Sequence, residues 1–245
     1  MLATSPRHPA ALFFLGVAML VQGRAQEAVD PLEAAARLHP DASVETHLAM
    51  ALRECGRVGE ALTWLERATA RVPAFAPAFK EFGNTYRKMR RFAEAEAVLR
   101  RGQEVAPAMP ELDMLLGAIC LDRADPVNAQ TAFARVLAQA PGHPEALFGL
   151  ATALVNQGEF ARAAEYYRQI LARDPRHVRA LLYLGHCQTE LGQWDEGVAT
   201  LRATLRIDPK ARGNVLRMLV ATARGKFYLK RSALVRLLDG GDVGV

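Results

Sequence analysis

Residues 144–175 have the sequence PEALFGLATALVNQGEFARAAEYYRQILARDP, and this stretch decides the fold. Apolar residues recur at helical spacing on both sides of a single glycine, Gly158. They are Leu147, Leu150, Ala151 and Leu154 before the glycine and Ala163, Tyr167 and Ile170 after it. The stretch therefore predicts two amphipathic helices that are joined by a short turn and pack as an antiparallel pair.

The same pattern recurs along the chain with a period of 34 residues. The closing prolines keep this spacing, except that the first interval is 33 residues: Pro40, Pro73, Pro107, Pro141, Pro175 and Pro209. The turn between the helices falls at Gly23, Gly56, Arg90, Ala124, Gly158 and Gly192. Glycine is frequent there because it readily adopts the left-handed conformation that ends many helices. Where Ala124 stands instead, Asp125 and Pro126 follow and predict that the next helix begins with a different cap.

Two columns of small residues predict that the helices of each pair cross closely. The first column is Gly16, Ala49, Gly83, Gly117, Ala151 and Gly185, and the second is Ala28, Ala61, Ala95, Ala129, Ala163 and Gly197. Glycine inside a helix costs about 0.5–1 kcal/mol relative to alanine, so its recurrence implies that two backbones approach closely. Large apolar residues are expected to fill the space around this crossing: Leu15, Leu48, Phe82, Leu116, Leu150 and Leu184, with Leu32, Leu65, Leu99, Phe133, Tyr167 and Leu201.

With these columns the chain resembles the tetratricopeptide repeat (TPR) family over residues 9–211. The resemblance implies an all-α fold, a right-handed superhelical solenoid of antiparallel helix pairs that continues without a break through six repeats. The expected segments are repeats at 9–41, 42–75, 76–109, 110–143, 144–177 and 178–211, basic capping helices at 212–238 and a flexible tail at 239–245. The chain departs from the family at an early position that is often aromatic, where only Phe79 fits and Glu45 is one of the exceptions. Pro31 also falls inside a predicted helix and should kink it.

No catalytic motif is found in the sequence. GxSxG, Walker, GxGxxG and HExxH patterns are absent. Cys55, Cys120 and Cys187 lie in different repeats without CxxC spacing, so we expect buried apolar residues and neither a disulfide framework nor a zinc site. The six histidines are equally scattered. We therefore expect a protein that is not an enzyme and uses no cofactor or metal.

The resemblance implies that the first helix of each repeat lines a concave groove and that its free side contacts a peptide or a partner helix. The candidate groove residues are Lys80, Asn84, Arg87 and Lys88, followed by Met114, Leu121, Phe148, Thr152, Val155, Leu182 and His186. The first four are mostly basic and favour an acidic or phosphorylated segment, although an ordinary solvated helix face is the alternative interpretation. The others are mostly apolar and are expected to stay partly exposed until a partner covers them.

Lys80 and Asn84 resemble one half of the carboxylate clamp with which some family members hold an acidic C-terminal peptide. The positions that would complete such a clamp are Leu115, Glu145 and Gly149, which supply no cation. We therefore do not expect the function of a chaperone-tail receptor.

Positive charge is concentrated at the end of the chain. The formal net charge is +5, and residues 210–245 alone contain eight basic and two acidic residues. A helical apolar pattern continues there at Leu216 and Leu219, so the segment is expected to cap the repeats. The alternative is that Lys226, Lys230, Arg231 and Arg236 contact an anionic surface. Acidic lipid and nucleic acid phosphates both fit such a segment, and within this alternative peripheral membrane contact is favoured over nucleic acid binding.

The N-terminal residues 1–25 permit two interpretations. An apolar run at 10–21 behind Arg7, with small residues at 23 and 25, imitates a cleavable secretory signal. Against this, the run follows the repeat columns in register, and its removal would leave the helix at 26–38 without a partner. We therefore expect a cytoplasmic protein, with a periplasmic location as the alternative. The run is too short to span a bilayer.

The sequence thus predicts a non-catalytic protein–protein interaction scaffold that binds a peptide or partner helix in its concave groove. Two other functions stay open: a substrate-recruiting accessory domain of an enzyme system, and a membrane-associated assembly factor that uses the basic C-terminal segment. Phe13, Val17 and Leu20, on the outside of the first predicted helix, also suggest a homodimer contact at the N-terminus.

Overall fold

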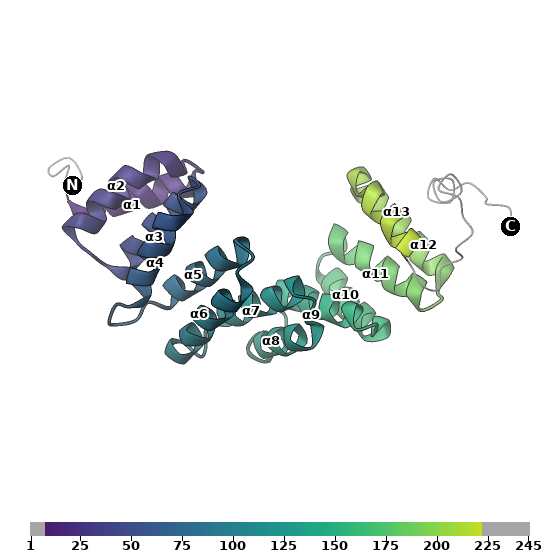
Figure 1. Cartoon of the computed structure of the whole chain (residues 1–245). Coiled ribbons are helices and arrows are strands. Elements are labelled where there is room, and N and C mark those ends of the chain that lie inside the picture. Colours follow the sequence, from purple (N-terminus) through teal and green to yellow (C-terminus); the bar gives the residue numbers. More distant parts are fainter. Residues whose placement is uncertain (1–7, 222–245) are drawn as a thin grey trace. The chain divides into compact units, whose positions relative to one another are not determined.

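The computed structural model of this 245-residue chain describes residues 8–221. These residues form helices and contain no strand (Figure 1), which confirms the all-α prediction. The predictions for Lys226, Lys230, Arg231 and Arg236, and for the tail at 239–245, lie outside the described residues.

Consecutive helices pair along the chain, and each predicted repeat range contains two of them (Figure 1). The helices are α1 (Pro9–Val21), α2 (Ala25–Leu38), α3 (Ala42–Glu54), α4 (Val58–Thr69), α5 (Ala76–Lys88), α6 (Phe92–Val105), α7 (Pro110–Asp122), α8 (Pro126–Gln139), α9 (Pro144–Asn156), α10 (Phe160–Arg173), α11 (Val178–Glu190), α12 (Trp194–Ile207), the short 3-10 helix η2 (Pro209–Ala211) and α13 (Arg212–Ala221). α1 contacts α2, α3 contacts α4, and the same pairing recurs at α5 with α6, α9 with α10 and α11 with α12.

The chain divides into two compact units, Met1–Ile119 and Cys120–Val245, with the boundary inside α7. The first unit contains α1 to α6, and the second contains α8 to α13. Within each unit the second helix of a pair also packs against the first helix of the next pair, as α2 does against α3 and α10 against α11.

The predicted turn positions all have a left-handed backbone. φ is between 75° and 80° at Gly23, Gly56, Gly158 and Gly192. Arg90 and Ala124 adopt the same conformation, with φ values of 59° and 56°. Asp125 caps α8 as predicted, because its side chain accepts a hydrogen bond from the Asn128 backbone N–H at 3.2 Å. The exit from α7 nevertheless keeps the left-handed geometry, so only the start of α8 differs from the other repeats.

The glycine columns mark close helix crossings, as predicted. A Cβ atom placed on Gly83 would lie 2.6 Å from the Leu99 side chain, and one placed on Gly197 would lie 2.9 Å from the Gly185 carbonyl oxygen. Neither distance leaves room for a methyl group. The prediction that Leu15 fills the space around the first crossing is wrong, because Leu15 is 48 % exposed. No helix precedes α1 in the described residues, so its outer side is left uncovered.

One departure from the family pattern, Glu45, has a structural explanation. Glu45 is fully buried and paired with two arginines. The Arg71 guanidinium donates to both carboxylate oxygens of Glu45 at 2.7 and 2.8 Å, and Arg67 lies 3.2 Å away. An ion pair thus occupies the place of the usual aromatic ring. α2 runs as a single helix through Pro31.

Candidate partner-binding site

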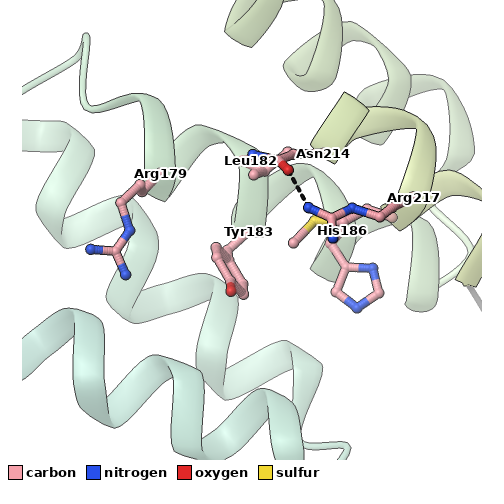
Figure 2. A pocket seen from close by; sticks show the side chains of 7 residues that line it. Arg179, Leu182, Tyr183, His186, Asn214 and Arg217 are labelled. Atoms are coloured by element: carbon pink, nitrogen blue, oxygen red, sulfur yellow. Dashed lines mark hydrogen bonds between the residues drawn. The ribbon is translucent and has the colours of Figure 1, made fainter. Parts of the chain in front are cut away.

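A cavity of about 570 Å³ lies between α11 and α13 in the second unit (Figure 2). Its lining residues are Arg179, Leu182, Tyr183, His186, Asn214, Arg217 and Met218. We call it the α11–α13 pocket. Its lining combines arginine, amide, phenol and imidazole groups with the apolar side chains of Leu182 and Met218, so the pocket offers both charge and hydrophobic contact.

Helical spacing places these side chains on facing surfaces. The four lining residues of α11 are spaced three, one and three positions apart, which places them on one side of that helix. The three lining residues of α13 are spaced three positions and one position apart and share one side of α13 in the same way. The start of α11 is held by His177, whose Nδ1 accepts a hydrogen bond from the Ala180 backbone N–H at 3.1 Å. A buried cluster below the pocket fixes α13 against α11 and α12: Leu182, Leu201, Val215 and Leu219.

Both arginines of the pocket lack an acidic partner among residues 8–221. The Arg179 guanidinium lies 4.2 Å from the centroid of the Phe148 ring, which is a cation–π contact. Arg217 donates a hydrogen bond to the Asn214 side-chain oxygen, drawn as a dashed line in Figure 2. In this view Tyr183 lies between the two arginines. Two positive charges are therefore available to a ligand.

His186 is the one predicted groove residue whose side chain both lines this pocket and has an unsatisfied polar atom. Its Nδ1 is buried and has no hydrogen-bond partner within the described part of the chain. Burial lowers the pKa of the imidazole, and the nearby carboxylate of Glu190 raises it by less. The ring packs edge-on against Phe160 with centroids 5.8 Å apart. At neutral pH the imidazole is therefore uncharged.

Phe148 and Leu182 correct the prediction of an exposed apolar run. Phe148 is 9 % exposed and Leu182 is 6 % exposed. The Phe148 ring packs edge-on against Tyr167 and Tyr183, at centroid distances of 5.5 and 5.4 Å. Leu182 belongs to the cluster below α13. The cover comes from the partner helix of the same pair and from the next helix along the chain, which a helix considered alone does not reveal.

The other predicted apolar groove residues are half-buried: Met114, Leu121, Thr152 and Val155. The Thr152 hydroxyl donates to the Phe148 carbonyl at 2.8 Å and lies 3.3 Å from the Tyr167 hydroxyl. Burial raises the pKa of Tyr167, so this phenol stays neutral. Thr152 is thus already committed within the unit.

The basic residues predicted in the third repeat lie next to acidic side chains. Lys80 Nζ is 3.4 Å from a Glu81 carboxylate oxygen, and Lys88 Nζ is 3.5 Å from a Glu54 carboxylate oxygen. Asn84 and Arg87 are half-buried. Lys80 and Lys88 thus each have an acidic neighbour, and Arg53 bonds to the same two carboxylates.

A second cavity of about 430 Å³ lies between α1 and α3 and is lined mainly by apolar residues. Arg53, its only basic residue apart from the histidine, donates hydrogen bonds to Glu81 at 3.0 Å, to Thr85 at 3.3 Å and to Glu54 at 3.2 Å. This guanidinium is fully engaged. The cavity consequently lacks the free charge that marks the α11–α13 pocket.

The described residues show no chemical centre of another kind. No group of three or more His, Cys, Asp or Glu side chains among them could hold a metal ion. Cys120 and Cys187 are buried as expected, and burial raises the pKa of the Cys187 thiol to about 12. Cys55 is half-buried, which corrects the prediction that all three cysteines are buried. In the same range no helix is long and apolar enough to cross a bilayer.

The sequence indicated α13 through its apolar spacing but did not identify the pocket. Arg179 and Arg217 are 38 positions apart and so do not share a repeat column. The available signal was that Arg217 lies beside Leu216 and Leu219 in the helical apolar pattern that follows the sixth repeat, and this helix, α13, contacts α11.

Four family models match the chain, and each is described as tetratricopeptide repeat. The matched residues are 2–43 and 148–212 for the first model, then 121–165, 42–67 and 81–109. Together they cover most of the six predicted repeats. Comparison with curated protein sequences finds no match.

Solved structures with the same architecture come from several proteins. PilF of Pseudomonas aeruginosa is 21 % identical with a TM-score of 0.71, and the match covers 82 % of this chain and 92 % of that one. YrrB, described as a TPR protein with an unusual peptide-binding site, is 19 % identical with a TM-score of 0.62 over 75 % of this chain and 95 % of its own. TTC0263 of Thermus thermophilus is 21 % identical with a TM-score of 0.59 over 74 % of this chain and 100 % of its own. At these identities the likeness establishes the fold alone.

Proposed function

This chain belongs to the tetratricopeptide repeat family, and on that premise we propose that it is a non-catalytic scaffold that binds a peptide or partner helix at the α11–α13 pocket. Proteins of this fold generally mediate protein–protein interactions. YrrB is described as having a peptide-binding site, and we extend peptide binding to this chain. The pocket supplies the place for it.

The observation that carries the proposal is the pair of arginines without acidic partners among the described residues. A guanidinium group binds a carboxylate through two parallel hydrogen bonds, and a partly enclosed pocket strengthens that attraction relative to bulk water. Arg179 and Arg217 therefore favour a segment with an acidic side chain. Met218, which is half-buried, offers a surface for an apolar neighbour of that side chain.

The third repeat has a smaller part in this proposal. Lys80 and Lys88 lie next to Glu81 and Glu54, so an acidic ligand would have to compete with these carboxylates. We propose that Lys80, Asn84, Arg87 and Lys88 form outer contacts that assist encounter with an acidic partner. Charge of this kind affects association rate and salt dependence more than affinity.

A peptide array tests the proposal directly. The array holds acidic–apolar peptides of about 12 residues, charge-reversed versions and scrambled versions, and it is probed with the full chain. We expect selective binding of acidic–apolar peptides, with affinity reduced about 10- to 100-fold by Arg179→Glu or Arg217→Glu, because each removes a charge-assisted hydrogen bond. Arg206→Glu, an exposed change at the end of α12, is the matched control and should bind as the wild type does. Equal binding by all four proteins would contradict the proposal.

The alternative functions are distinguished by the identity of the natural partner. An enzyme or its protein substrate recovered by cross-linking to the pocket would indicate a substrate-recruiting accessory domain. Binding to anionic vesicles that survives Arg179→Glu would instead support a membrane-associated assembly factor that uses its basic C-terminal residues. N-terminal mass spectrometry of the mature protein tests the proposed cytoplasmic location against the periplasmic alternative.

A further inference from the structure

The first helix exposes one apolar side to solvent. Phe14 is 67 % exposed, Leu15 is 48 % exposed and Val21 is 83 % exposed, and Ala18 lies between them and is also exposed. We call these four residues the α1 face. No residue of α1 carries a charge, since its sequence is PAALFFLGVAMLV. An outer surface at the end of a repeat array is normally polar, so this composition is unusual for a solvent-facing helix.

The positions of Leu15 and Ala18, two of the four residues of the α1 face, are buried in every later repeat. The residues that correspond to Leu15 are between 0 and 7 % exposed: Leu48, Phe82, Leu116, Leu150 and Leu184. Those that correspond to Ala18 are likewise buried: Ala51, Thr85, Ile119, Ala153 and Cys187. α3, α5, α9 and α11 each follow and contact the second helix of the preceding pair, whereas no helix precedes α1 in the described residues. Leu15 and Ala18 therefore belong to a repeat-stacking surface that has no partner helix within residues 8–221.

The uncharged character of the α1 face indicates which partner it fits. A symmetric dimer places the same patch of both copies in contact, so the patch must be complementary to itself. A charged helix face would repel its own copy, whereas side chains of Phe, Leu, Ala and Val can interdigitate with identical ones. An acidic or basic partner would find no complementary charge on this helix.

We infer that two copies of the chain associate through the α1 face. The contact involves a different side of the helix from the residues that the sequence suggested. Phe13 packs edge-on against His47 at a centroid distance of 5.2 Å, and Val17 and Leu20 line the cavity between α1 and α3, which Val21 at the end of the helix also lines. Phe13, Val17 and Leu20 are half-buried. Phe14, Leu15, Ala18 and Val21 are exposed.

The size of the helix sets the strength of the contact. A 13-residue helix is about 20 Å long. Stable interfaces bury about 800 Å² on each partner, and one side of such a helix offers less than that. The dimer is therefore reversible, with a dissociation constant in the micromolar range. Its formation does not depend on the α11–α13 pocket.

Sedimentation velocity of the full chain between about 1 and 200 μM tests the inference, since this range brackets a micromolar equilibrium. Wild type should shift reversibly from monomer to dimer. Phe14→Glu and Leu15→Glu should weaken dimerisation at least 10-fold, because each places a charge opposite itself across the symmetry axis. Val127→Glu, at a position in α8 that is 61 % exposed, is the control and should dimerise as wild type does. Circular dichroism verifies that the variants keep their helical content.

A cross-linking experiment keeps the inference testable if one charged variant misfolds. Ala18→Cys in a Cys55→Ser background should give a covalent dimer with a short bis-maleimide, whereas Ala97→Cys, an exposed alanine on α6, should not. A wild type that stays monomeric up to 200 μM would overturn the inference. So would dimerisation that is equally strong in wild type, Phe14→Glu, Leu15→Glu and Val127→Glu.

Discussion

At the scale of single residues, Glu45 shows how a buried charge is accommodated in the repeat core. Its carboxylate is enclosed between α3 and the end of α4, where Arg71 binds both oxygens and Arg67 adds a third contact. The interaction with Glu45 raises the pKa of Arg71, so the guanidinium stays charged. A buried carboxylate that loses its partner keeps its desolvation penalty, which makes the arginine more important than an exposed pair would be.

Arg71→Ala should lower the free energy of unfolding by about 2–3 kcal/mol, because it leaves a buried carboxylate with only Arg67. Arg37→Ala removes an arginine whose side chain is 76 % exposed and paired with Glu33, and should change stability by less than about 0.5 kcal/mol. Urea unfolding followed by circular dichroism measures both. If the two variants lose the same stability, the Glu45 pair does not stabilise the repeat core. Glu45→Leu combined with Arg71→Ala should recover part of the loss.

His186 connects the pocket with the pH dependence of stability. Burial holds the pKa of this imidazole below its ordinary value of 6.5 in the folded state. Between pH 6.5 and the lower pKa that His186 has in the folded state, the unfolded chain binds more protons than the folded chain. The contribution of His186 is therefore fully present above pH 6.5 and decreases as the pH falls through 6.5 toward the folded pKa. Glu190 on α11 and Arg217 on α13 are charged groups near this ring.

Acidification from pH 7.5 to 5.5 should consequently lower the melting temperature of wild type more than that of His186→Gln, in which no titrating group is left at this position. His39→Gln changes an exposed histidine and should retain the full wild-type decrease. Differential scanning calorimetry at the two pH values gives the comparison. An equal decrease in wild type and His186→Gln would show that protonation of another group controls the acid response.

At the scale of helices, the turn between the two helices of each pair demands a left-handed residue. The backbone N–H of that residue bonds to a carbonyl three positions earlier, and the next N–H bonds to one five positions earlier. At Ala124 these bonds reach Leu121 and Cys120 at 3.0 and 2.8 Å. Alanine satisfies the same bonds as glycine but has a Cβ that crowds the backbone in this conformation.

Ala124→Gly should therefore raise the free energy of unfolding by about 0.5–1 kcal/mol, since removal of the strain outweighs the added flexibility of the unfolded chain. Gly158→Ala is the reciprocal change at the equivalent turn, where φ is 78°, and should lower stability by about 1 kcal/mol. Chemical denaturation of both variants gives the two signs. A loss of stability in Ala124→Gly would contradict the assignment of strain to this turn.

At the scale of the whole molecule, the chain is built from contacts between neighbouring helices. Each of its two compact units buries apolar surface by stacking successive pairs, so its core is a strip that runs along the pairs. Two surfaces of the described residues are not covered by this stacking. One is the α11–α13 pocket, where two arginines have no acidic partner within the described residues, and the other is the α1 face, where the stacking sequence begins. We propose that they bind different partners, an acidic segment and a second copy of the chain.

Local sequence signals were sufficient for the elements of the fold. The four glycines among the turn residues marked their turns because glycine adopts a left-handed backbone without strain. Gly83 and Gly197 marked the crossings because only a missing side chain permits such close approach. The spacing of Leu150, Ala163 and Tyr167 predicted which sides of the helices are buried. Each of these properties belongs to one residue or one helix, so it can be recognised from the sequence alone.

The sequence by itself determined the family, the helix pairs and the turns, but only the tertiary structure decided which side chains are free. Phe148 was predicted to be exposed and is covered by Tyr167 and Tyr183, while Leu15 was predicted to be covered and is exposed. Arg179 and Arg217 come together only when α13 packs on α11. The physical reason is that exposure and charge pairing depend on neighbours from other helices, whereas the helical pattern depends on residues a few positions away.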